Sequence, residues 1–188
     1  DAGLGIENTI NGSGLNADAQ HSTVSADMWL GLPTGADPVW IQYEFDGVYK
    51  LHKMQIWNYN VAFELVLGFG LKDVTVEYST DGADWMTLGE VQFAQATATS
   101  KYTANTTVDL AGVAARFVRL NVNSGWGMMG QFGLSEVRFL SIPVLAHGPQ
   151  PASGAQGLEP DVVLSWRAGR EAASHDIYLS ADQDAVAN

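Results

Sequence analysis

A strand, a tight turn and a returning strand can be read from residues 70–85, and this hairpin constrains the fold more than any other stretch of the chain. Its apolar side chains recur at every second position, with polar residues between them: Val74, Val76 and Tyr78. This period of two is typical of a strand with one buried face. Asp81 and Gly82 then supply a turn, because glycine adopts positive φ without a Cβ clash. We therefore expect a hairpin that lies on a core, with Trp85 opening the second strand.

The same patterns predict seven short strands, at 39–45, 50–59, 71–79, 85–93, 102–109, 115–122 and 134–140. Residues that favour turns separate several of these strands, at Asp46-Gly47, Asp81-Gly82 and Ala111-Gly112. No segment shows a convincing amphipathic helical period. Short strands that are joined by turns and covered by no helices predict an all-β fold, an antiparallel β-sandwich.

The charge of the chain excludes several classes of partner. Nine basic residues against twenty-one acidic ones give a net charge of −12, which repels phosphate backbones, so we expect no nucleic acid partner. The same charge opposes binding to anionic lipids. No run approaches the eighteen uncharged apolar residues of a membrane span, so we expect no membrane insertion. The absence of cysteine excludes disulfides and thiolate metal sites.

Four segments, taken in order, resemble one protein family. They are the hairpin at 70–85, Val39–Phe45 (VWIQYEF), Arg116–Leu120 (RFVRL) and Gly133–Phe139 (GLSEVRF). Together they are similar to discoidin domains, the coagulation-factor C-type modules with bacterial carbohydrate-binding relatives, over roughly residues 8–140. The resemblance implies a galactose-binding-like jelly roll with one larger and one smaller sheet. It also implies export from a bacterium, to the medium or the cell surface.

The chain changes character after residue 142. Four of its six prolines lie between Pro143 and Pro160, which predicts a linker or the first strand of a new module at 143–160, after a first domain at 1–142. Strand patterns at 162–166 and 175–180, with Trp166 on the first, resemble the first half of a fibronectin type III or immunoglobulin-like domain. Residues 161–188 are therefore expected to form a partial β-sandwich. Either this segment is a fragment, or residues 158–188 complete their sandwich by self-association with a neighbouring molecule.

The N-terminal loop is a candidate calcium site. It offers hard oxygen ligands within a short irregular segment, as calcium requires. Carbohydrate-binding discoidin modules commonly hold a structural calcium between such a loop and a glutamate on the closing strand. By that resemblance Asp18, Asp27 and Glu136 would be ligands, and the residue types of the loop add Asn16 and Ser22. The alternative is a loop closed by Asx-turns without a metal.

Two loops carry candidate sugar-binding residues. A sugar site needs an aromatic plate for the apolar face of a pyranose ring and amides or charged groups for its hydroxyls. The predicted residues lie in the segments 57–70 and 123–132: Trp57, Asn58, Tyr59, Asn60, Phe69, Trp126, Met128 and Gln131. The alternative for the apolar part of these loops, from Phe63 to Phe69 and the two methionines, is packing across the end of the sandwich.

Enzymatic signals are weak. The four histidines are scattered, and none lies in an H-E-x-x-H or G-x-S-x-G context. We therefore predict a non-catalytic, secreted or cell-surface carbohydrate-binding module with a structural calcium ion. The alternative is a structural or adhesive protein that assembles into extracellular oligomers or filaments through its incomplete C-terminal module.

Overall fold

The structure is a computed structural model that describes residues 5–31, 38–170 and 172–182. The chain divides into two compact units, Asp1–Ser141 and Ile142–Asn188. Each unit is described here by itself. Among the described residues, no helix is both long and apolar enough to cross a membrane.

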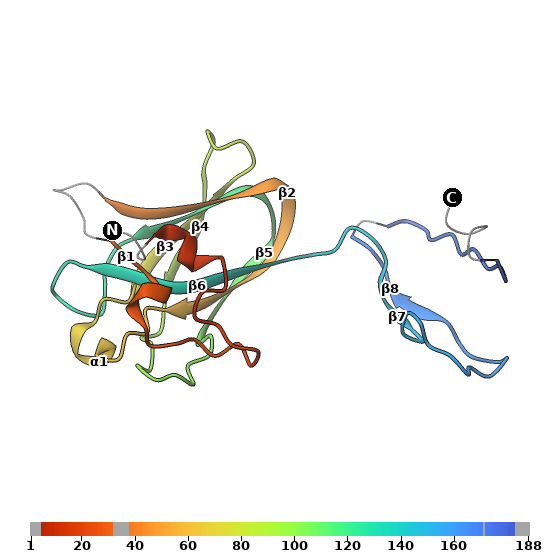
Figure 1. The fold of residues 1–188 in the computed structure, drawn as a ribbon. Coiled ribbons are helices and arrows are strands. Elements are labelled where there is room, and N and C mark those ends of the chain that lie inside the picture. The colour runs from red at the N-terminus through yellow and green to blue at the C-terminus, as the bar shows by residue number, and fades with distance from the viewer. Residues whose placement is uncertain (1–4, 32–37, 171, 183–188) are drawn as a thin grey trace. The chain divides into compact units, whose positions relative to one another are not determined.

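The first unit is built on one six-stranded antiparallel sheet with the order β1-β6-β2-β5-β3-β4 (Figure 1). Its strands are β1 (Trp29–Gly31), β2 (Val39–Asn58), β3 (Asp73–Ser79), β4 (Met86–Gln92), β5 (Thr106–Val122) and β6 (Phe132–Ser141). Its helical elements are single turns: η1 (Ile6–Thr9), η2 (Ser25–Asp27) and α1 (Glu64–Leu67). The predicted all-β antiparallel sandwich is confirmed.

Two long strands bend this sheet into two layers. β2 and β5 pair with each other in both layers, and their register shifts between Glu44 and Tyr49 and again between Leu51 and Lys53. The prediction divided each of these strands in two, and this division is wrong. The turn-favouring residues Gly47 and Gly112 are accommodated within continuous bent strands, with Gly112 at φ +70°. Bulges of this kind increase bend and twist without ending a strand.

The core lies between the layers and takes alternate residues from β2 and β3. The largest buried cluster includes Ile41, Met54, Ile56, Leu120 and Leu134, all fully buried. In the hairpin, Val74 and Val76 are buried as expected, and Tyr78 packs against the same cluster. The turn is held by Ser79 and Asp81, whose side-chain oxygens accept hydrogen bonds from the backbone amides of residues 81–84. β4 then begins at Met86, directly after Trp85.

The second unit contains one strand pair among its described residues, β7 (His147–Gln150) and β8 (Ser165–Arg167). The predicted strand at 162–166 is present only at its end, in β8. Residues 175–180 form no strand, contrary to the sequence pattern. Ile177, Tyr178 and Leu179 are exposed there, and no described strand pairs with them. The resemblance of this unit to a fibronectin type III or immunoglobulin-like domain stays a prediction.

Candidate functional site

Two loops at one end of the sandwich are joined through their backbones. We call residues 59–72 and 123–131 the loop pair; α1 lies in the first loop (Figure 1). The amide of Gly127 donates to the carbonyl of Gly68 at 2.6 Å, and the amide of Trp126 donates to Gly70 at 3.1 Å. A Cβ on Gly127 would collide with the carbonyl oxygen of Leu67. Only glycine at 127 therefore permits this approach, and the sequence-predicted loops do form one surface.

A buried carboxylate holds the first loop in shape. Glu64 is fully buried, and its Oε1 and Oε2 accept hydrogen bonds from the amides of Gly70 at 2.9 Å and Phe69 at 3.1 Å. Burial raises the pKa of this carboxyl, and the two amide hydrogen bonds partly oppose the shift. The side chain of Gln95 donates to the Glu64 carbonyl at 3.0 Å. The sequence prediction did not identify Glu64, because a lone glutamate in an apolar loop carries no local signal of burial.

Half of the predicted sugar-binding residues lie in the interior. Asn58 is fully buried: its Nδ2 donates to Leu71 O at 2.7 Å, and its Oδ1 accepts from the Leu71 amide at 2.9 Å. Asn60 is also fully buried and donates to three carbonyls. Trp57 and Tyr59 are only 3% and 2% exposed. The predicted surface contacts of these four side chains are not present in this structure. β2 continues through Asn58 and pairs with β6, and Asn60 is bonded to carbonyls of distant loops.

The other four predicted residues reach the surface of the loop pair. Trp126 is 37% exposed, its indole N–H donates to Phe93 O at 3.1 Å, and Lys72 Nζ lies 5.3 Å from its ring centroid. Met128 is completely exposed, and Phe69 and Gln131 are half-buried. The structure thus brings an aromatic ring, a cation and an amide to the same loops.

The loop pair also exposes large apolar side chains beyond those predicted to bind: Phe63 (71%), Leu65 (64%), Val66 (84%) and Met129 (60%). The alternative prediction, that this stretch packs across the end of the sandwich, is wrong for these residues. It holds in part for Phe69, whose ring centroid lies 6.2 Å from that of Tyr59. Apolar residues gathered at a loop tip indicate a contact surface.

Four of the five predicted calcium ligands make side-chain hydrogen bonds in this structure: Asn16, Ser22, Asp27 and Glu136. Asn16 Oδ1 accepts from the amides of Asp18 and Gln20, which is an Asx-type turn. Ser22 Oγ donates to Asp27 Oδ2 at 2.5 Å. Glu136 accepts from the amide of Gly12 at 3.1 Å, and Arg138 Nε lies 3.6 Å from its other oxygen. Among the described residues, no three His, Cys, Asp or Glu side chains are arranged to hold a metal ion. Calcium also takes carbonyl, amide and hydroxyl oxygens, which lie outside that set, so a calcium ion in this loop stays a prediction.

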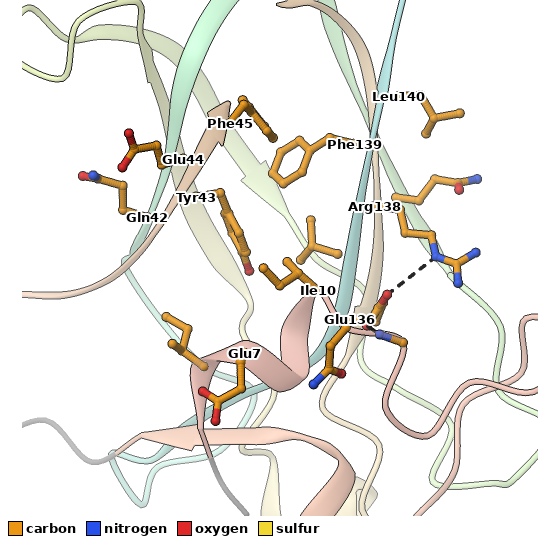
Figure 2. Close-up of a pocket in the computed structure, with 15 residues that line it drawn as sticks. Glu7, Ile10, Gln42, Tyr43, Glu44, Phe45, Glu136, Arg138, Phe139 and Leu140 are labelled. Atoms are coloured by element: carbon orange, nitrogen blue, oxygen red, sulfur yellow. Dashed lines mark hydrogen bonds and ion pairs between the residues drawn. The ribbon is translucent and has the colours of Figure 1, made fainter. Parts of the chain in front are cut away.

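A groove of about 890 Å³ lies elsewhere on the first unit, between η1, the first half of β2 and β6 (Figure 2). Three aromatic rings line it: Phe139 packs edge-to-face against Tyr43 and Phe45, with centroids 5.2 Å and 5.1 Å apart. The Tyr43 hydroxyl donates to Thr9 Oγ1 at 3.2 Å. Burial raises the pKa of Tyr43. Among the described residues, β6 beyond Leu134 pairs only with β2, and β2 before Phe45 pairs only with β5. The groove therefore follows two strand edges.

Glu136 is the one predicted site residue that borders this groove. It is 2% exposed, and burial raises the pKa of its carboxyl while Arg138 opposes the shift. The sequence prediction missed Tyr43, Phe45 and Phe139 as groove residues. These three aromatic residues alternate with polar residues along their strands, as core residues do. The alternation does not reveal which of the core positions lie at an open edge of the sheet.

Comparison with known proteins identifies the family to which this chain belongs. Residues 6–136 match the family model of the F5/8 type C domain, so the chain belongs to that family, and the predicted discoidin resemblance is confirmed. No curated protein matches the chain.

Solved structures agree with the fold. The F5/8 type C domain of a Bacteroides fragilis protein aligns with a TM-score of 0.52 at 13% identity, over 74% of this chain and 82% of its own. A domain described as GH31 CBM32-2 bound to GalNAc aligns at 0.51 with 17% identity, over 74% of this chain and 89% of its own. CBM32-3 from a family 31 glycoside hydrolase of Clostridium perfringens gives 0.49 at 17% identity, over 61% and 74%.

Proposed function

We propose that this chain is a carbohydrate-binding module of a secreted or cell-surface bacterial protein, and that it holds a glycan without altering it. The observation that carries the proposal is the exposed Trp126 on two joined loops of an F5/8 type C fold. A protein of similar fold is described as bound to GalNAc, which supports a sugar as the ligand class.

Binding would depend on a few shallow contacts. Trp126 offers an aromatic ring to the C–H face of a pyranose, and Gln131 offers an amide to its hydroxyls. Because such contacts only slightly exceed the entropy cost of association, we expect weak affinity for a single sugar unit. The ring is held in place by its hydrogen bond to Phe93 O, so little side-chain freedom is lost on binding.

A glycan array followed by calorimetry tests the proposal. The wild-type chain should bind a restricted set of glycans, and Trp126→Ala should weaken this binding about tenfold or more. Met86→Ala is the matched control, because Met86 is also apolar and exposed (52%) but lies on β4, outside the loop pair. Gln131→Ala is a second variant, which keeps the indole. It should also weaken binding, and it tests the site in case loss of the indole disturbs the loop. Silence across neutral and acidic glycans would overturn the proposal, and release of a modified sugar would overturn its non-catalytic part.

A second candidate function is assembly with protein neighbours outside the cell. The exposed apolar residues of the loop pair favour it, since such a cluster is costly to leave in water. The exposed run from Ile177 to Leu179 in the second unit is a further candidate for self-association. Sedimentation velocity across a concentration series tests both. A monomer at all concentrations would exclude self-association, and oligomers lost on Phe63→Ser would locate the contact in the loop pair.

A further inference from the structure

A second surface with sugar-binding chemistry lies on the outer face of the sheet, outside the loop pair. Alternate residues of β2, β5 and β3 point away from the core there, while Ile41, Leu120 and Val76 point into it. Arg119 is central, because it is in register with Gln42 on one side and with Glu77 on the other. We call Trp40, Gln42, Glu77, Trp85, Arg119 and Asn121 the sheet-face cluster.

Two indole rings contact the same guanidinium in this cluster. Arg119 Cζ lies 3.8 Å from the ring centroid of Trp85 and 5.1 Å from that of Trp40. Trp85 comes from the hairpin turn, where its indole N–H donates to Gly82 O at 3.1 Å. Trp40 comes from β2 and is 52% exposed. The cluster therefore holds planar groups from two separate segments at the surface.

Polar groups around the rings are fixed by hydrogen bonds. Gln42 Oε1 accepts from Arg119 Nη2 at 2.9 Å, and Glu77 Oε2 accepts from Asn121 Nδ2 at 2.8 Å. Arg119 Nη1 lies 3.9 Å from the same Glu77 oxygen. These side chains are ordered before any ligand arrives, so binding would cost little additional conformational entropy.

We propose that the sheet-face cluster is a second glycan site, which binds an extended neutral polysaccharide along the sheet. The inference rests on the proposed function and adds the substrate class. Indole faces suit the C–H faces of pyranose rings, and the amides and guanidinium suit their hydroxyls. The charges of the cluster are paired with each other, whereas the chain as a whole carries −12, so a neutral glycan fits better than a uronate or sulfated one. A sheet face runs past successive sugar units, which favours a chain over a terminal sugar.

Affinity electrophoresis against soluble polysaccharides tests this site. The probes are mixed-linkage β-glucan, galactomannan and xyloglucan as neutral chains, polygalacturonate as the acidic chain, and galactose and GalNAc as single sugars. Trp40→Ala should weaken binding to a neutral polysaccharide about tenfold and leave single-sugar binding within twofold. Met86→Ala, which removes an equally exposed apolar side chain of the same sheet, should leave both unchanged. Gln42→Ala keeps both rings and should weaken polysaccharide binding less than Trp40→Ala.

The outcomes separate this site from the loop pair. Loss of polysaccharide binding on Trp40→Ala, in a variant that melts like wild type, supports the sheet-face site even if Trp126→Ala has no effect. Equal binding by Trp40→Ala and wild type, with loss on Trp126→Ala, overturns the sheet-face site and leaves the proposed function standing. Preference for polygalacturonate over every neutral chain overturns the ligand class. Absence of binding to every neutral polysaccharide overturns the sheet-face site, whereas the proposed function is tested by the glycan array. Indole N–H resonances of Trp40 and Trp85 that shift with polysaccharide provide a direct readout.

Discussion

The carboxylate of Glu64 and the backbone amide of Gly70 form a 2.9 Å hydrogen bond in the interior of a loop whose tip is exposed and apolar. This bond, together with that from Phe69, closes the turn of chain around α1. The loop that presents the candidate contact surface is therefore shaped from inside by a charged side chain.

Glu64→Ala should destabilise the first unit and loosen this loop. It leaves the amides of Phe69 and Gly70 without their acceptor, at about 1–3 kcal/mol for each group, so we expect a loss of roughly 2–6 kcal/mol in the free energy of unfolding. Urea denaturation measures it. Glu90→Ala removes an exposed glutamate of β4 and should change stability by less than about 0.5 kcal/mol. Equal stabilities of the two variants would contradict the role assigned to Glu64.

The stability contributed by Glu64 should depend on pH. Burial raises its folded-state pKa above the ordinary value of 4.5, so the folded state holds this proton more tightly than the unfolded state. That contribution is fully present below pH 4.5 and is lost as the pH rises through the raised pKa. Glu64→Gln carries no titrating group at this position. The unfolding free energy of wild type minus that of Glu64→Gln should therefore fall from pH 4 to pH 7. A difference that rises with pH, or does not change, would show that the folded-state pKa is not raised.

Gly127→Ala should separate the two loops. The new methyl group would collide with Leu67 O and lie 3.1 Å from Gly68 O, both backbone atoms that cannot turn aside. We expect weaker glycan binding together with a loss of about 1–3 kcal/mol in stability. Gly47→Ala is the control, since its Cβ would first meet Tyr49 at 4.0 Å. Unchanged binding by Gly127→Ala would show that sugar binding does not require the joined loops.

Calcium remains a prediction that a melting experiment tests. If the N-terminal loop binds calcium, an ion concentration a hundredfold above the dissociation constant adds about 2.7 kcal/mol to stability, so EDTA should lower Tm by several degrees. Asp27→Asn should remove the calcium effect, and magnesium in place of calcium is the ion control. Melting curves with EDTA and with calcium that coincide would contradict the calcium site.

Local residue order was enough to identify the hairpin, the alternating core positions and the family. Val74 and Val76 face the core because a strand places every second residue on one side, and this period is visible in a single stretch. The turn after Ser79 follows from the preferences of Asp81 and Gly82. These properties depend on neighbours in the chain, which a sequence displays directly.

The positions of the candidate sites depended instead on contacts between distant segments. Asn58 looks like a polar loop residue in the sequence, but Leu71 and Ala94 surround its amide in the interior. Trp40 and Ile41 are adjacent apolar residues, yet one is half exposed beside Arg119 and the other is buried. Which face of a strand is covered depends on the layer that packs against it, and that layer comes from residues far away in the chain. The pattern of the sequence therefore fixes how residues alternate, whereas the packing of the layers decides which of them remain free to bind.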